Sequence, residues 1–140
     1  MSPTEEALQT FPSDQIPVLY RPADLSANTN GSGAVAEKTL AQLQQLNAGW
    51  QFKQDAANGQ VLFPYRQHPV TLPSLQQALA AVPANITIIL DMKALPADTQ
   101  AKAVAQVLER NQAWNRVLIY STDASYQQAF AQYPKARLFE

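Results

Sequence analysis

The sequence predicts an α/β domain with a parallel sheet, and three observations carry this prediction. Near-continuous runs of Ile, Leu and Val occur within 85–93 and 116–121, as is typical of strands covered on both faces. Segments with apolar residues at helical spacing alternate with these runs, and glycine or proline marks many of the boundaries. Alternating strands and helices imply right-handed crossovers, which place successive strands side by side in the same direction.

The composition is that of one globular domain and excludes several functional classes. Of the 140 residues, 46% are hydrophobic and 15% are charged, which excludes a disordered segment. The formal net charge is −1 with no basic cluster, so we expect no nucleic-acid partner. There is no cysteine for disulfides, thiolate metal sites or a nucleophile. Because the longest apolar run, 86–90, cannot span a bilayer and the N-terminus lacks signal-peptide features, we expect the cytoplasm.

The N-terminal half contains one predicted strand, one sharp turn and one helix. Ile16–Tyr20 is a short apolar segment that predicts a strand. Residues 28–33, "NTNGSG", indicate a sharp turn, because Asn-Gly and a second glycine tolerate positive φ. Three leucines at helical spacing predict a helix over 39–46. Residues 51–73 contain one glycine and three prolines, which predict a long ordered loop of the kind that is usually functional.

The C-terminal half alternates helices and strands. Ser74 is a candidate helix N-cap, and Pro83 ends the helix that follows it. The remaining predicted elements are a strand at 85–93, a helix at 97–111, a strand at 116–121, a helix at 125–132 and a last candidate strand at 136–140.

Asp91 and Lys93 are the first candidate site residues. They lie two apart at the C-terminal end of the predicted strand 85–93, so both side chains point to the same face. Ligands bind at this end of the strands in parallel α/β folds. A carboxylate beside an ammonium group can hold a divalent cation and a phosphate oxygen. The alternative is an ion pair that only neutralises itself near the edge of the sheet.

Four other polar or aromatic residues are candidates with plainer alternatives. Ser121 follows the next strand at a comparable level, although a hydroxyl there is also a common turn or cap residue. His68 is the only histidine, so this chain holds neither a pair of histidines for acid and base catalysis nor a metal site with several histidines. Arg21 can bind an anion but cannot abstract a proton. Trp50 is either a packing residue or a ligand platform.

Several segments resemble, in the same order, those of the glycerophosphodiester phosphodiesterase family. They are "IPVLYRPADLSANTNGSGAVAEKTLAQLQQLNAGWQF", "VTLPSLQQAL", "IILDMK" and "VLIYST". Members of that family have a strand that ends in His-Asp, a Thr-Asn-Gly-x-Gly turn, a helix of the "TLAEL" kind and Asp-Ala-Gly before an aromatic residue. They then have an Ile-Pro-Thr-Leu-Glu-Glu segment, a Glu-x-Lys strand and a strand that ends in Ser-Phe. The resemblance covers about residues 14 to 140.

The resemblance implies a TIM barrel that hydrolyses glycerophosphodiesters, such as glycerophosphocholine, to glycerol 3-phosphate and an alcohol with Mg²⁺ or Ca²⁺. A complete barrel needs about 250 residues. We therefore expect residues 1–140 to form a single partial barrel, with parallel strands that resemble the third to the sixth. A small insertion after the third strand, at about 23–72, would roof the substrate, and Trp50 and Ser121 would line the pocket.

The resemblance also implies roles for individual residues. Lys93 matches the lysine of Glu-x-Lys and would bind the phosphate of a glycerophosphodiester or a glycerol phosphate. Arg21 has no such match, and its charge alone makes it a second candidate for the same phosphate. Asp91 stands where that motif has glutamate and would bind the metal ion. Glu5 is a second candidate metal ligand, since the family's Glu-x-Asp falls near Glu5-Glu6-Ala7.

Departures from the family pattern remove the groups that transfer protons. The second carboxylate of Glu-x-Asp is alanine here, the His-Asp is Arg21-Pro22, and the His-Arg-Gly of the first strand has no counterpart in this chain. We therefore expect a phosphodiesterase-like protein of lipid metabolism that is inactive as this chain alone. One alternative is a non-catalytic module that binds phosphate ligands or a partner. Another is an active enzyme whose missing strands come from a second chain or from an N-terminal extension. Because a partial barrel leaves open edges, we expect a homo-oligomer or a covering partner.

Overall fold

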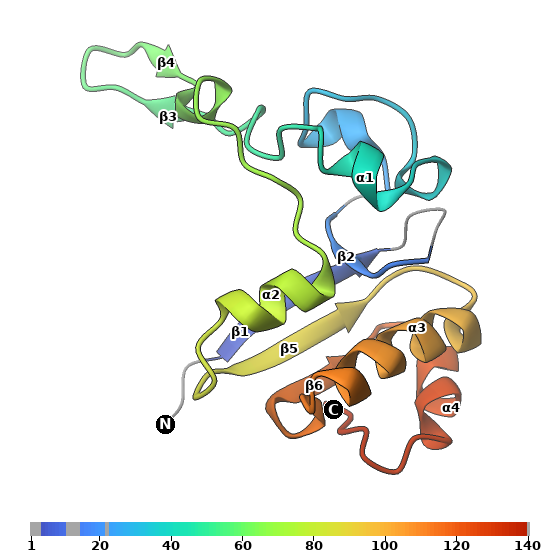
Figure 1. Ribbon diagram of the computed structural model, residues 1–140. Coiled ribbons are helices and arrows are strands. Elements are labelled where there is room, and N and C mark those ends of the chain that lie inside the picture. The colour runs from blue at the N-terminus through green and yellow to red at the C-terminus, as the bar shows by residue number, and fades with distance from the viewer. Residues whose placement is uncertain (1–3, 11–14, 22, 140) are drawn as a thin grey trace.

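The computed structural model describes residues 4–10, 15–21 and 23–139 (Figure 1). These residues form a four-stranded sheet in the order β2-β1-β5-β6 and a separate hairpin, β3-β4. The strands of the sheet are β1 (Thr4–Thr10), β2 (Val18–Leu19), β5 (Thr87–Met92) and β6 (Val117–Tyr120). The hairpin strands are β3 (Gln54–Asp55) and β4 (Val61–Leu62).

Three parallel strands form the centre of the sheet. β5 pairs with β1 from Thr4↔Thr87 to Gln9↔Met92, and with β6 from Ile88↔Val117 to Asp91↔Tyr120. The alternation of side chains sends Ile88, Leu90 and Met92 to one face, where all three are buried. The predicted strands at 85–93 and 116–121 and their parallel order are therefore confirmed.

Three helices pack with β5 and β6 in the main hydrophobic core. They are α2 (Leu75–Ala81), α3 (Ala97–Arg110) and α4 (Ser125–Ala131), close to the predicted helices. Ser74 begins α2 with a capping box, because its hydroxyl accepts from the Gln77 amide while the Gln77 side chain accepts from the Ser74 amide. No helix in the described ranges is both long and apolar enough to cross a membrane.

The sheet differs from the predicted one at the edge formed by β2. The strand expected over Ile16–Tyr20 is reduced to Val18–Leu19 and runs antiparallel to β1. β1 itself was not predicted, and it takes the position beside β5. The connection over 11–17 is too short for a crossover between parallel strands, which needs a dozen or more residues. The chain therefore reverses its direction after β1, and β2 runs antiparallel to β1.

The segment after α4 pairs with β6 only locally. The strand expected at 136–140 is reduced to an isolated bridge between Ile119 and Leu138. Two hydrogen bonds form this bridge, and they join Ile119 to the residues on either side of Leu138. At the other edge, Leu19 donates to the Pro73 carbonyl at 3.0 Å. Both edges of the sheet are thus partly paired within the chain, and the expected oligomer or covering partner stays a prediction.

Residues 23–72 fold around a second, smaller core. This region contains η1 (Leu25–Ala27), η2 (Val35–Glu37), α1 (Leu40–Leu43), the hairpin and η3 (Pro64–Arg66). The turn expected at 28–33 is present, and Gly33 adopts a φ of 88° that favours glycine. The helix expected over 39–46 shrinks to α1, and the loop expected over 51–73 contains the hairpin. The buried apolar side chains of the second core are Val18, Tyr20, Leu25, Val35, Leu43 and Leu72.

We predict that Leu90→Ala lowers the free energy of unfolding by about 2–5 kcal/mol, because Leu90 is fully buried in the central strand. Leu95→Ala is the matched control, since Leu95 is 58% exposed, and its cost should stay within about 0.5 kcal/mol. Urea denaturation followed by circular dichroism measures both. Similar costs for the two variants would contradict this core.

Candidate functional site

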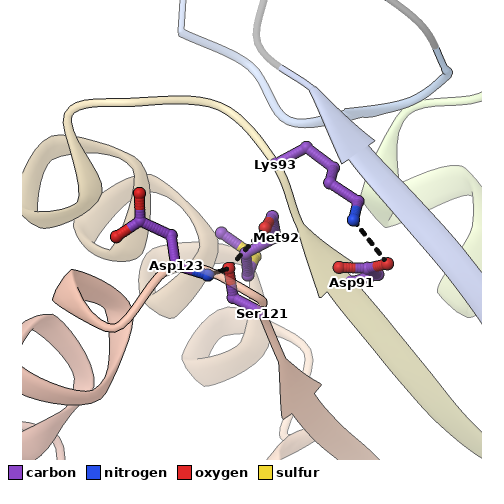
Figure 2. Close-up of polar contacts among 5 residues, drawn as sticks. All are labelled: Asp91, Met92, Lys93, Ser121 and Asp123. Carbon is purple, nitrogen blue, oxygen red and sulfur yellow. Dashed lines mark hydrogen bonds and ion pairs between the residues drawn. The ribbon is translucent and has the colours of Figure 1, made fainter.

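The C-terminal ends of β5 and β6 bring the candidate residues to one edge of the sheet. Asp91 pairs with Tyr120 in the parallel register, so Met92 and Ser121 lie side by side at the strand ends, and Lys93 follows Met92 (Figure 2). Ligands of parallel α/β proteins bind at this edge. This edge of the sheet is therefore the first candidate for a functional site.

Asp91 and Lys93 form an ion pair at this edge. Lys93 Nζ lies 3.2 Å from Asp91 Oδ2, so the expectation that both side chains share a face is met. The Asp91 side chain is only 5% exposed, whereas that of Lys93 is 32% exposed. Asp91 Oδ1 is buried and has no hydrogen-bond partner among the described residues. Because buried polar atoms are almost always bonded, this oxygen is the first candidate contact for a water molecule or a ligand.

The chemical capacity of the pair follows from its charges. The ammonium group of Lys93 can donate to an anion, and the free oxygen of Asp91 is the kind of donor that hard cations prefer. Together the two groups carry no net charge, which weakens the attraction for a phosphate. A cation bound to Asp91 would restore the attraction of Lys93 for a phosphate, because the cation offsets the carboxylate charge.

The described residues do not complete a metal site. Nowhere in them do three His, Cys, Asp or Glu side chains gather around a point that could hold an ion. Asp91 would supply one oxygen, and the rest of the coordination would have to come from elsewhere. Glu5 pairs with Ile88 through the backbone of β1, and its side chain lies outside what the structure describes. The expected Mg²⁺ or Ca²⁺ therefore stays a prediction.

A hydrogen bond from Ser121 links the ends of β5 and β6. Its hydroxyl donates to the Met92 carbonyl at 2.8 Å and accepts from the Asp123 amide at 3.0 Å (Figure 2). These bonds support the plainer interpretation of Ser121 as a turn residue. Ser121 also lines a cavity of about 450 Å³ beside Tyr120, Tyr126 and Phe139, so a pocket role is still open.

Two residues beside the site were not singled out from the sequence. The Tyr126 hydroxyl of α4 donates to the Ala94 carbonyl, directly after Lys93, and burial raises the pKa of Tyr126 so that the hydroxyl keeps its proton. Hydrogen bonds from Ser125 hold the pKa of Asp123 below its usual value. The apolar spacing of α4 predicts that Tyr126 is buried, but its hydrogen bond depends on tertiary structure.

The other candidate residues make no described contact with this edge of the sheet. Arg21 is exposed after the antiparallel β2, and Trp50 is half-buried in the insertion. Neither makes a hydrogen bond or ion pair with Asp91 or Lys93 in the described residues. His68 is exposed on the insertion, as expected of a loop histidine.

Comparisons with known proteins converge on one family. The model of the Glycerophosphoryl diester phosphodiesterase family matches residues 11–139. The uncharacterized protein Rv2277c of Mycobacterium tuberculosis is 49% identical over 112 residues, which are 80% of this chain and 36% of that protein.

Solved structures of the same kind share the fold. The crystal structure of the glycerophosphoryl diester phosphodiesterase domain of Rv2277c has a TM-score of 0.84 at 41% identity, over 96% of this chain and 47% of that one. An Oleispira antarctica phosphodiesterase in complex with the product sn-glycerol-3-phosphate has a TM-score of 0.73 at 21% identity, over 92% and 49% of the two chains. The chain thus spans less than half the length of these relatives.

We predict that Ser121→Ala lowers the free energy of unfolding by about 1 kcal/mol, because it breaks the hydroxyl link between the ends of β5 and β6. Thr122→Ala is the control, since Thr122 is exposed next to it and should change stability by less than about 0.5 kcal/mol. Chemical denaturation of both variants gives the comparison. An unchanged midpoint for Ser121→Ala would favour a pocket role over a structural one.

Proposed function

The chain belongs to the Glycerophosphoryl diester phosphodiesterase family, and from this premise we propose that it binds a glycerol phosphate or glycerophosphodiester at Asp91 and Lys93. The observation that carries the proposal is the unpartnered, buried Oδ1 of Asp91 beside the ammonium group of Lys93. Lys93 donates to a phosphate oxygen, and Asp91 supplies one ligand to a weakly held divalent cation. The glycerol 3-phosphate seen in the Oleispira antarctica phosphodiesterase makes that compound the natural probe.

Binding without turnover is the form of the activity that these residues favour. Hydrolysis of a diester needs a general acid and a general base within reach of the reacting oxygens. The single histidine, His68, is exposed on the insertion, and Arg21 stands where the family has a histidine. The Ser121 hydroxyl is occupied by the Met92 carbonyl, and Asp123 is held by Ser125. None of these groups is suited to move a proton at the phosphate.

The second candidate function is hydrolysis with help from outside these residues. Family membership favours it, since the match extends over almost the whole chain. The acid and base would then come from polypeptide beyond this sequence or from a second chain. Release of glycerol 3-phosphate from glycerophosphocholine by the purified chain would support this candidate and reject binding alone. Arg21, Trp50 and Ser121 remain predicted contributors to the ligand pocket under either function.

We predict that Lys93→Gln weakens the binding of glycerol 3-phosphate by about tenfold or more, because a charge-assisted hydrogen bond is lost. Isothermal titration calorimetry with Mg²⁺ present measures the dissociation constant. Lys102→Gln is the matched control, since this exposed lysine of α3 lies outside the site and should leave binding unchanged. Equal affinities of the wild-type chain and Lys93→Gln would contradict the proposal.

We predict that Asp91→Asn removes the effect of Mg²⁺ on the binding of glycerol 3-phosphate. In the wild-type chain, Mg²⁺ should strengthen binding, because it offsets the charge that Asp91 places beside Lys93. In Asp91→Asn the lysine is already unopposed, so binding without Mg²⁺ should be several times stronger than in the wild-type chain. The same calorimetric titration, with and without Mg²⁺, tests this linkage. A Mg²⁺ effect that survives in Asp91→Asn would place the cation elsewhere.

A further inference from the structure

The insertion carries a concentration of exposed apolar side chains. Of the nine large apolar side chains that are exposed in the described part of the chain, five lie within residues 52–70. We name these five the insertion patch; each is between 40% and 54% exposed. Figure 1 shows the β3–β4 hairpin of this region standing away from the sheet and its helices. The members of the patch are Phe52, Val61, Leu62, Tyr65 and Val70.

Packing within the insertion fixes three members of the patch close together. The rings of Phe52 and Tyr65 meet edge to face with centroids 5.4 Å apart. Gly49 lies beneath both Tyr65 and Val70, since a Cβ at this position would lie 2.6 Å from Tyr65 Cβ and 3.2 Å from Val70 Cγ2. The glycine is required for this close approach, so the exposure of these side chains belongs to an ordered surface.

Arg66 adds a fixed positive charge beside the patch. Its guanidinium group lies 3.8 Å from the centre of the Phe63 ring and 4.5 Å from that of Trp50. Its Nε donates to the Trp50 carbonyl at 3.0 Å. Among the described residues no carboxylate forms an ion pair with Arg66, and its terminal N–H groups make no hydrogen bond. Such a fork of donors is suited to bind a phosphate group.

Each face of the hairpin carries one exposed apolar side chain beside a polar one, because Leu62 pairs with Gln54 and Val61 pairs with Asp55. Val61 and Leu62 are consecutive in β4, so their side chains point to opposite faces, and both are exposed. A protein partner that packs against one face would leave the other in water. A lipid interface surrounds the hairpin and covers both faces at once, and aromatic side chains such as Phe52 and Tyr65 are favoured at that depth.

A second copy of the chain is a poorer occupant of this surface. An aromatic side chain presents about 150–250 Å², and three of the five members are smaller aliphatic residues, so the half-exposed patch offers at most on the order of 400–500 Å² of apolar surface. A stable protein interface buries about 800 Å² on each partner, of which a little more than half is apolar, so the patch is large enough for either occupant and charge decides between them. A two-fold contact would bring Arg66 and Lys53 of one copy close to the same residues of the other, and like charges would meet.

We propose that the insertion patch docks on a bilayer surface that contains anionic phospholipids, with Arg66 bound to a lipid phosphate. Residues 50–70 contain Lys53 and Arg66 against Asp55, a net charge of +1, whereas the whole chain has a net charge of −1. The positive side of the molecule in this region therefore faces the anionic lipid. Asp55 lies on the hairpin and limits insertion to the depth of the headgroups. The proposal concerns a surface separate from Asp91 and Lys93 and does not depend on the proposed ligand.

Sedimentation with phospholipid vesicles tests this proposal on the intact chain. The vesicles contain either phosphatidylcholine alone or phosphatidylcholine with an equal amount of phosphatidylglycerol, at low salt. The wild-type chain should bind the mixed vesicles at least about tenfold more tightly than phosphatidylcholine, and salt should weaken the binding. Absence of binding to the mixed vesicles would overturn the proposal.

Paired variants distinguish vesicle binding through the insertion patch from nonspecific adsorption by other exposed apolar side chains. Phe52→Ser with Leu62→Ser should weaken binding to the mixed vesicles by at least about tenfold, because two inserted side chains are lost. Phe139→Ser with Leu95→Ser is the matched control, since both residues are exposed outside the insertion, and its binding should stay within about twofold of wild type. Arg66→Gln should weaken binding only to the mixed vesicles, and Arg66→Lys should restore part of it.

Two further results would overturn the proposal. One is equal binding by the patch variant and its control, with both variants folded by circular dichroism. The other is a dimer of the wild-type chain in light scattering that the patch variant converts to a monomer. That result would make the patch a contact between two copies.

Discussion

The burial of the Asp91 carboxylate is the constraint on which the candidate site depends. A buried carboxylate is stable only when a neighbouring charge and hydrogen bonds compensate for lost water. Lys93 compensates one oxygen at 3.2 Å, and the other has no partner in the described residues. The surrounding bonds all serve to hold the backbone, since Ser121 binds the Met92 carbonyl and Tyr126 binds that of Ala94. The fold thus fixes the pair and leaves one buried oxygen without a hydrogen-bond partner in the described residues.

The two hydrophobic cores stabilise different parts of the chain. The main core beneath β5 and β6 positions the strand ends, whereas the smaller core belongs to the insertion and the segment that leads into it. Asn47 stabilises the outer part of the insertion, because its amide donates to the Tyr65 carbonyl and its oxygen accepts from the amides of Gly49 and Val70. Surface properties of the insertion can therefore change without disturbing the strand ends.

Local sequence predicted the elements whose stability is local or strongly periodic. α3 was expected at 97–111 because its apolar positions repeat over several turns, and the pairing of Asp91 with Lys93 followed from the period of a strand. β1 was missed because "TEEALQT" contains good helix formers, and pairing with β5 overrides that preference. The hydrogen bond of Tyr126 and the unpartnered oxygen of Asp91 could not be predicted, because both depend on neighbours distant in sequence.

We propose that a phosphate and a cation meet at the Asp91–Lys93 pair. A crystal structure of the chain with glycerol 3-phosphate and Mg²⁺ tests it most directly. We predict a phosphate oxygen within hydrogen-bond distance of Lys93 Nζ, and the ion in contact with Asp91 Oδ1. A phosphate bound elsewhere, with the ion pair intact and Oδ1 still without a partner, would contradict it.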